Sequence, residues 1–226
     1  MPKKTKARKV TDSEKAWNRR PKPTSYRIEE IPINKTILIV CEGQTEEMYF
    51  KSFPVLGLKV DAINLGGQSK LKLVETTEMI QSEEKRDEVW CVFDMDVKRG
   101  EAEFSDFDNA IEKAKNLGYK VAYSNDAFEL WFYLHFEYTD AENHRTFYYE
   151  ELGKLLDLNY EKEGKRYDFC QKLYDILEKH LASSQSKAIE RARKIYEDRS
   201  DLPYHQQNPV TRVFELVEEL NRNLRR

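Results

Sequence analysis

The feature that most constrains the fold is a continuous apolar run near the start of the chain, Thr36-Ile37-Leu38-Ile39-Val40-Cys41. A β-branched run without polar alternation is typical of a strand buried on both faces, as in parallel sheets. Comparable runs recur at 59–65, 88–93 and 119–123, with helical patterns between them. This alternation predicts an α/β fold, with a mostly parallel sheet flanked by helices.

Amphipathic spacing predicts the helices. They are expected at 45–53, 71–80, 104–114 and 128–136, and after residue 147 at 150–158, 167–181 and 184–197. The 71–80 helix should bury Leu71, Val74, Met79 and Ile80. No strand is expected after residue 147, and a last helix should start at Asn208-Pro209, an N-cap followed by proline. Val210, Val213, Phe214, Val217 and Leu220 would form its core face. These patterns divide the chain into a basic arm (1–34), an α/β core (35–140) and a helical region that packs on the core (141–226).

The net charge of −3 is unevenly distributed along the chain. Residues 1–27 hold ten Lys and Arg against two acidic residues, a net +8, while the remainder holds 28 basic and 39 acidic residues, a net −11. Basic arms commonly contact nucleic acid, because each neutralised phosphate releases a counterion. A solvated tail has the same composition, so both interpretations stay open. The candidate nucleic-acid contacts are Lys3, Lys4, Lys6, Arg8, Lys9, Arg19 and Arg20.

The cysteines and the apolar content indicate where the chain resides. Cys41, Cys91 and Cys170 are widely spaced and form no CxxC pair, which argues against a zinc site and favours a reducing, cytoplasmic location. No apolar run reaches the roughly 18 residues of a membrane span. The N-terminal region lacks the apolar core of a signal peptide. No membrane partner is expected.

Acidic residues follow two of the predicted strands. Glu42 comes directly after the first strand, and Asp94 and Asp96 follow the third. Sites in open α/β sheets form at the carboxyl ends of strands, and residues two apart on an extended segment face the same side. Clustered carboxylates favour hard cations such as Mg²⁺ or Mn²⁺, which point to phosphoryl chemistry. Because Asp and Gly also cap helices and form turns, a structural role stays open.

Other chemistries fit less well. A haloacid-dehalogenase-type phosphatase places its DxD after the first strand and has Thr or Val two residues later, whereas position 98 is Lys. The sequence contains no GxxxxGK[ST] phosphate loop, no GxGxxG fingerprint and no GxSxG elbow. A nucleophilic triad built on another motif stays open.

Four segments, in order, resemble the RloB-like family, a branch of the TOPRIM-related proteins. They are Cys41-Glu42-Gly43-Gln44-Thr45-Glu46-Glu47 with Tyr49-Phe50, Phe93-Asp94-Met95-Asp96, Ser124-Asn125 through Phe128-Glu129-Leu130-Trp131 to His135-Phe136, and Asn208-Pro209-Val210-Thr211. From the first to the last, the segments span roughly 35–220. One departure is Asp126, where the family pattern has proline.

The resemblance implies a TOPRIM-like fold and an acidic set of Glu42, Asp94 and Asp96. It implies that Asp94 and Asp96 hold one or two Mg²⁺ (or Mn²⁺) ions, with Glu42 completing the shell or acting as general acid/base. It further implies a nuclease acting on DNA or RNA in bacterial anti-phage defence, beside an ATPase partner. The alternative is a non-catalytic module that binds nucleic acid or the ATPase.

Several further residues carry two interpretations each. Glu46, which the resemblance includes, is a second metal ligand or a first-turn acid stabilised by the helix dipole. Glu47 is expected on the exposed face of the same helix. Lys70 follows a glycine-rich loop and either assists phosphate binding or is a surface lysine.

Two residues of the apolar 128–136 segment belong to the same group of candidates. Glu129 is the only acid in that segment, and it either forms a capping box with Asp126 or reaches the site. His135 is a satisfied core histidine or a proton shuttle.

Overall fold

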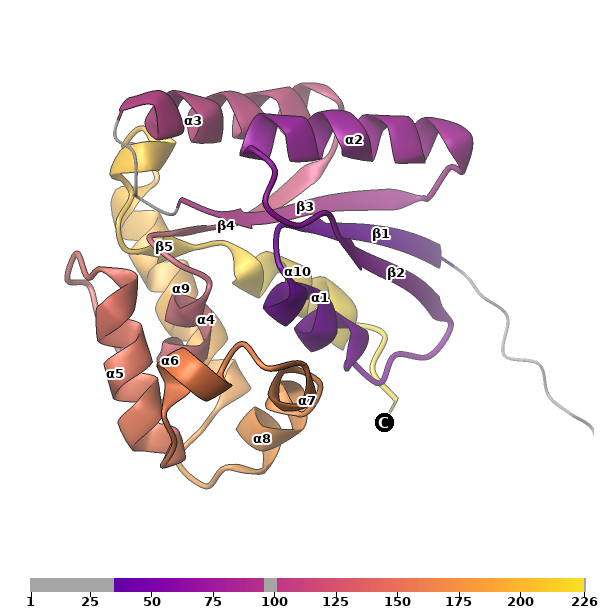
Figure 1. Cartoon of the computed structure of the whole chain (residues 1–226). Coiled ribbons are helices and arrows are strands. Elements are labelled where there is room, and N and C mark those ends of the chain that lie inside the picture. The colour runs from indigo at the N-terminus through magenta and orange to yellow at the C-terminus, as the bar shows by residue number, and fades with distance from the viewer. Residues whose placement is uncertain (1–34, 96–100, 226) are drawn as a thin grey trace, which may run out of the picture. The chain divides into compact units, whose positions relative to one another are not determined.

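A five-stranded sheet forms the centre of the molecule (Figure 1). The computed structural model describes residues 35–95 and 101–225. The strand order is β2-β1-β3-β4-β5, with β1 to β4 parallel and β5 antiparallel to β4. The strands are β1 (Lys35–Cys41), β2 (Leu58–Asn64), β3 (Glu88–Asp94), β4 (Lys120–Asn125) and β5 (Val210–Thr211). The predicted α/β class and the four parallel strands are confirmed.

Helices cover both faces of this sheet. In Figure 1, α2 and α3 lie over one face and α1 and α10 over the other, with α4 to α9 forming a helical layer beyond them. The helices are α1 (Gln44–Lys51), α2 (Lys70–Glu83), α3 (Glu101–Asn116), α4 (Glu129–Leu134), α5 (Arg145–Leu156), α6 (Tyr160–Glu163), α7 (Tyr167–Cys170), α8 (Leu173–Lys179), α9 (Gln185–Arg199) and α10 (Val213–Asn221). The inner strand β1 is buried from Ile37 to Cys41, as expected for a strand covered on both sides.

The start of α2 shows how neighbouring elements are fixed at the site's edge of the sheet. The Ser69 hydroxyl accepts a hydrogen bond from the Lys72 N–H, as an N-cap does. The Asp106 carboxylate of α3 accepts from the backbone N–H groups of Lys70 (2.7 Å) and Leu71 (3.3 Å). These bonds satisfy the first amides of α2 and hold Lys70 beside the ends of the strands.

The prediction for the last helix was wrong about its start. Val210 and Thr211 form β5 instead, and α10 begins at Val213. Pairing with β4 explains the difference, because the hydroxyls of Ser124 and Thr211 are hydrogen-bonded at 2.8 Å and the Arg212 N–H donates to the Tyr123 carbonyl at 2.8 Å. The predicted core face is correct for the residues within α10, since Val213, Phe214, Val217 and Leu220 are buried, whereas Val210 is buried in β5.

Two other boundaries and one buried position differ from the predictions. The predicted 167–181 helix is two short helices, α7 and α8. Helix α5 starts at Arg145, five residues before the predicted start at 150. Met79, expected in the core, is 61% exposed, and Leu73 and Thr77 are buried in its place on α2.

Candidate active site

The ends of two adjacent strands bring the first predicted acids together. Strands β1 and β3 pair in parallel, with Cys41 opposite Val92, and the Glu42 N–H donates to the Val92 carbonyl at 3.0 Å. Glu42 therefore leaves the sheet beside Asp94, the last residue of β3. The predicted proximity of these two carboxylates is confirmed.

Two helices add further carboxylates to the same place. Helix α1 begins after Gly43 and carries Glu46, whose Oε2 would lie 2.6 Å from a Cβ built on Gly43. Helix α4 begins with Glu129, which is 4% exposed. Glu42, Glu46, Asp94 and Glu129 all line one pocket of about 340 Å³. A glycine at position 43 leaves the room that the Glu46 carboxylate occupies.

Basic side chains pair with these acids. The Lys70 Nζ lies 3.3 Å from Glu42 Oε1, and the Arg145 guanidinium donates to Asp94 Oδ2 at 3.0 Å. The Lys165 Nζ lies 3.9 Å from Glu129 Oε1. Arg145 and Lys165 also line the pocket, so it carries charges of both signs.

The crowding of carboxylates changes their acidity. Burial, and then the charge of Asp94, raise the pKa of Glu42 to about 7 against the opposing effect of Lys70. The same two causes raise the pKa of Glu46 to about 8. Burial also raises the pKa of Glu129, which Lys165 opposes. These acids share a site where a negative charge is costly unless a cation compensates it.

A family model described as RloB-like protein matches residues 37–220. The chain belongs to the RloB-like family. The resemblance read from the four sequence segments is thereby confirmed, and the mostly parallel sheet flanked by helices is consistent with a TOPRIM-like fold. Searches of curated proteins and of solved structures gave no match. Within the described residues of this RloB-like protein, no helix has the length and apolar character needed to cross a bilayer.

The donor set of this RloB-like protein suits a hard divalent cation. All four acids offer oxygen ligands, and Glu42 Oε2 is buried without a hydrogen-bond partner among the described residues. Over 35–95 and 101–225, however, no three His, Cys, Asp or Glu side chains stand close enough together to form a ready metal site. Asp96, a predicted ligand, lies outside the described residues, as do Lys3, Lys4, Lys6, Arg8, Lys9, Arg19 and Arg20.

Two predicted site residues with alternative interpretations belong to this region. They are Glu129, which lines the pocket, and Lys70, which contacts the lining residue Glu42. Phe128 and not Asp126 stands at the N-cap of α4, and the Asp126 carboxylate instead accepts from the Arg145 N–H at 2.9 Å, so the predicted capping box is wrong. Glu129 lines the pocket, as the alternative interpretation required. Lys70 reaches the site through its contact with Glu42.

His135 and Glu47 lie elsewhere in the fold. His135 is buried, and its Nδ1–H donates to the Trp131 carbonyl at 2.9 Å, so it has the contacts of a core histidine. Glu47 was predicted to be exposed, but it is 8% exposed. Its carboxylate accepts from Lys51 Nζ at 2.5 Å and from the Asn64 side chain, and this explains how it is buried.

Arg145 and Lys165 were missed by the sequence reasoning. Arg145 is the first residue of α5, and Lys165 lies in the turn between α6 and α7. Neither belongs to a recognisable motif, and both reach the acids only because the helical layer folds back over the strand ends. The lone acid in an apolar segment, Glu129, was the one signal that a basic partner was needed.

Proposed function

We propose that this RloB-like protein is a Mg²⁺-dependent nuclease that hydrolyses phosphodiester bonds of DNA or RNA. The observation that carries the proposal is the single pocket that Glu42, Glu46, Asp94 and Glu129 share with Arg145 and Lys165. Carboxylates suit a hard cation, and guanidinium and ammonium groups suit a phosphate, so the pocket offers both halves of a metal-dependent phosphodiester site.

The roles we assign follow from position. Glu42 and Asp94, at the ends of adjacent strands, would hold the ion, with Glu46 and the predicted Asp96 as further ligands. Mg²⁺, or Mn²⁺ in its place, would supply positive charge that stabilises the phosphate in the transition state. Arg145 would bind a non-bridging phosphate oxygen, because its planar guanidinium can donate two parallel hydrogen bonds. Lys165 and Lys70 would add charge at the two sides of the pocket.

The biological setting is proposed from the family. The chain matches the RloB-like family over residues 37–220, and the resemblance to that family implied a role in bacterial anti-phage defence with an ATPase partner. We therefore propose that the nuclease acts in the cytoplasm and that the ATPase controls it.

Cleavage assays with site variants test the proposal. The wild type is incubated with DNA, total RNA and tRNA in the presence of Mg²⁺ or Mn²⁺, beside Glu42→Gln and Asp94→Asn. We expect both variants to fold but to lose metal-dependent cleavage. Glu47→Gln is the matched control, because Glu47 is also a buried acid of the same region but faces Lys51 and Asn64. Cleavage by Asp94→Asn at the wild-type rate would refute the assignment.

The second candidate is a non-catalytic module that binds nucleic acid or the ATPase. It is favoured by the three ion pairs of Lys70, Arg145 and Lys165, which already compensate much of the acidic charge. Thermal unfolding with and without Mg²⁺ or Mn²⁺ separates the two. Stabilisation by the ion that disappears in Asp94→Asn supports the nuclease, and nucleic-acid binding without any ion effect supports the module.

A further inference from the structure

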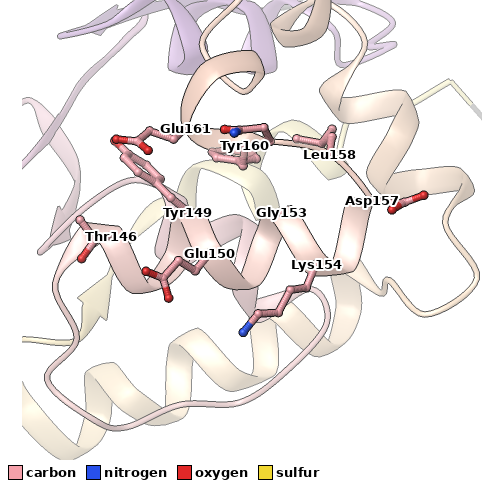
Figure 2. Close-up of a pocket in the computed structure, with 10 residues that line it drawn as sticks. Thr146, Tyr149, Glu150, Gly153, Lys154, Asp157, Leu158, Tyr160 and Glu161 are labelled. Atoms are coloured by element: carbon pink, nitrogen blue, oxygen red, sulfur yellow. The ribbon is translucent and has the colours of Figure 1, made fainter.

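A second pocket lies beside the acidic site, between α5 and α6 (Figure 2). Its volume is about 550 Å³, within the range of about 300–1,000 Å³ typical of small-molecule sites. Thr146, Tyr149, Glu150 and Gly153 line it from successive turns of α5, and Leu158 and Tyr160 line it from the segment that enters α6. None of these residues is needed for the metal chemistry proposed above.

The two pockets are neighbours. Arg145, which lines the acidic pocket, and Tyr149, which lines the second, are four residues apart on α5, or about 6 Å along its axis. The Lys165 Nζ lies 3.9 Å from Glu129 Oε1 on one side and 5.5 Å from the Tyr149 ring centroid on the other. Lys165 therefore stands at the boundary between them.

Tyr160 forms another part of that boundary. It is 1% exposed, and its ring centroid lies 5.9 Å from that of Tyr149. Its hydroxyl is buried with no hydrogen-bond partner among the described residues. Burial, and then the charge of Glu129, raise the pKa of this hydroxyl, with a smaller effect of Glu46. Tyr160 lines the second pocket, and its hydroxyl is thus within electrostatic range of the acids that line the first.

The lining of the second pocket is not that of a phosphate site. Its described lining holds three carboxylates, Glu150, Asp157 and Glu161, and the cation among them, Lys154, has its Nζ 2.5 Å from the Glu151 carboxylate. Carboxylates only accept hydrogen bonds, so they repel phosphate and favour groups that donate. In Figure 2 the Tyr149 side chain lies on the same side of the pocket as Glu150 and Glu161. A flat ring beside acceptors suits a flat ligand with amino groups at its edge.

We propose that this pocket binds a nucleobase that carries an exocyclic amino group, stacked on Tyr149, while the phosphate of the same nucleotide lies at Arg145 and Lys165. The spacing of Arg145 and Tyr149 on one helix allows one nucleotide to reach both. Glu150 accepts from the amino group, as Glu and Asp accept from the N4 amino group of cytosine. The phosphate position rests on the proposed nuclease function, and the base position rests on the second pocket.

Cytosine and uracil test the proposal, because they have similar size and cytosine carries an amino group where uracil carries a carbonyl oxygen. The probes are fluorescein-labelled 12-nucleotide strands, C against U as RNA and dC against dT as DNA. Their binding to the full chain is measured by fluorescence anisotropy, with Ca²⁺ in place of Mg²⁺. We expect the C strand, or the dC strand, to bind at least about fivefold more tightly than its U or dT counterpart.

Three variants and one control locate the effect. Tyr149→Ala should weaken binding at least about fivefold, and Tyr149→Phe should preserve it, because stacking needs the ring alone. Glu150→Gln, at an exposed position where folding is not at risk, should narrow the preference for C, since an amide both donates and accepts. The control is Tyr138→Ala, an exposed aromatic residue in a separate pocket with Lys187 and Lys194, which should leave binding unchanged.

The outcomes separate this proposal from the nuclease proposal. Equal binding of C and U strands, unchanged in Tyr149→Ala and Glu150→Gln, would overturn the base site even if Asp94→Asn abolishes cleavage. Binding of spermidine that these variants weaken, without any effect on the strands, would show a site for organic cations and also overturn it. A wild type that binds none of the strands and cuts no nucleic acid would overturn both proposals.

Discussion

Glu46→Gln should stabilise the metal-free protein at alkaline pH. Glu46 is buried in a pocket with three other carboxylates, and burial and Asp94 raise its pKa from 4.5 to about 8. The folded chain therefore holds this proton more tightly than the unfolded chain does. Stability contributed by the protonated acid is fully present below pH 4.5 and is lost as the pH rises towards 8. Glutamine has the same shape and carries no charge, so it should escape this loss.

The size of the effect follows from the pKa values. A pKa that moves from 4.5 to about 8 corresponds to about 4 to 5 kcal/mol of lost stability above pH 8, at about 1.4 kcal/mol for each tenfold change in the proton equilibrium. The carboxamide introduced by the substitution remains a buried polar group, which costs about 1 to 3 kcal/mol where it lacks partners. We expect a net gain of about 2 kcal/mol at pH 8.5 and a net loss of about 1 kcal/mol at pH 5, where the wild-type acid is still protonated in the folded chain and only the cost of the carboxamide remains.

Urea unfolding in EDTA, followed by circular dichroism at pH 5 and pH 8.5, measures this difference. The matched control is Glu47→Gln on the same helix, whose carboxylate already has Lys51 and Asn64 as partners, so its loss should leave stability unchanged or lower. Equal pH dependence in wild type and Glu46→Gln, or a less stable variant at pH 8.5, would show that burial and Asp94 do not raise the pKa of Glu46 as described.

Three further changes should have measurable effects. Burial lowers the pKa of His135 from 6.5 to about 4, so stability should fall by about 3 kcal/mol as the pH drops through this window, and His135→Gln should flatten that loss in urea titrations. A Cβ at Gly164 would lie 2.6 Å from the Tyr160 carbonyl oxygen, so Gly164→Ala should cost about 1 to 3 kcal/mol and lower Tm in calorimetry. Deletion of residues 1–27 should weaken nucleic-acid binding and flatten its salt dependence, and a salt slope equal to that of the full chain would mean that the arm makes no phosphate contacts.

The sequence predicted the parallel strands and the acids at their ends because both depend on local patterns. The apolar run at 36–41 can be buried only as an inner strand, and Glu42 must then leave the sheet at its carboxyl edge. The same reasoning placed Asp94 beside it, and the register of β1 with β3 confirms this. The position of Asp96 stays a prediction.

The errors arose where long-range contacts decided the structure. Thr211 pairs with Ser124, 87 residues earlier, and no local signal at Asn208-Pro209 reveals that partner. Asp126 looked like a helix cap but binds the start of α5 instead. Arg145 and Lys165 reach the acids through the fold of the helical layer, which sequence spacing does not encode.

The division of charge in the pocket has a consequence for how such a protein can diversify. Glu42 and Asp94 stand at the ends of β1 and β3, and Glu46 on the first turn of α1, so the sheet and its first helix place these acids. Arg145 and Lys165 come from the helical layer, where His144, Thr146 and Arg166 beside them are exposed. Under the proposed function, changes in α5 and α6 would alter which substrate binds while the acids at the strand ends keep their positions. Under that proposal, the residues for metal binding and the residues for substrate selection lie in separate stretches of one chain.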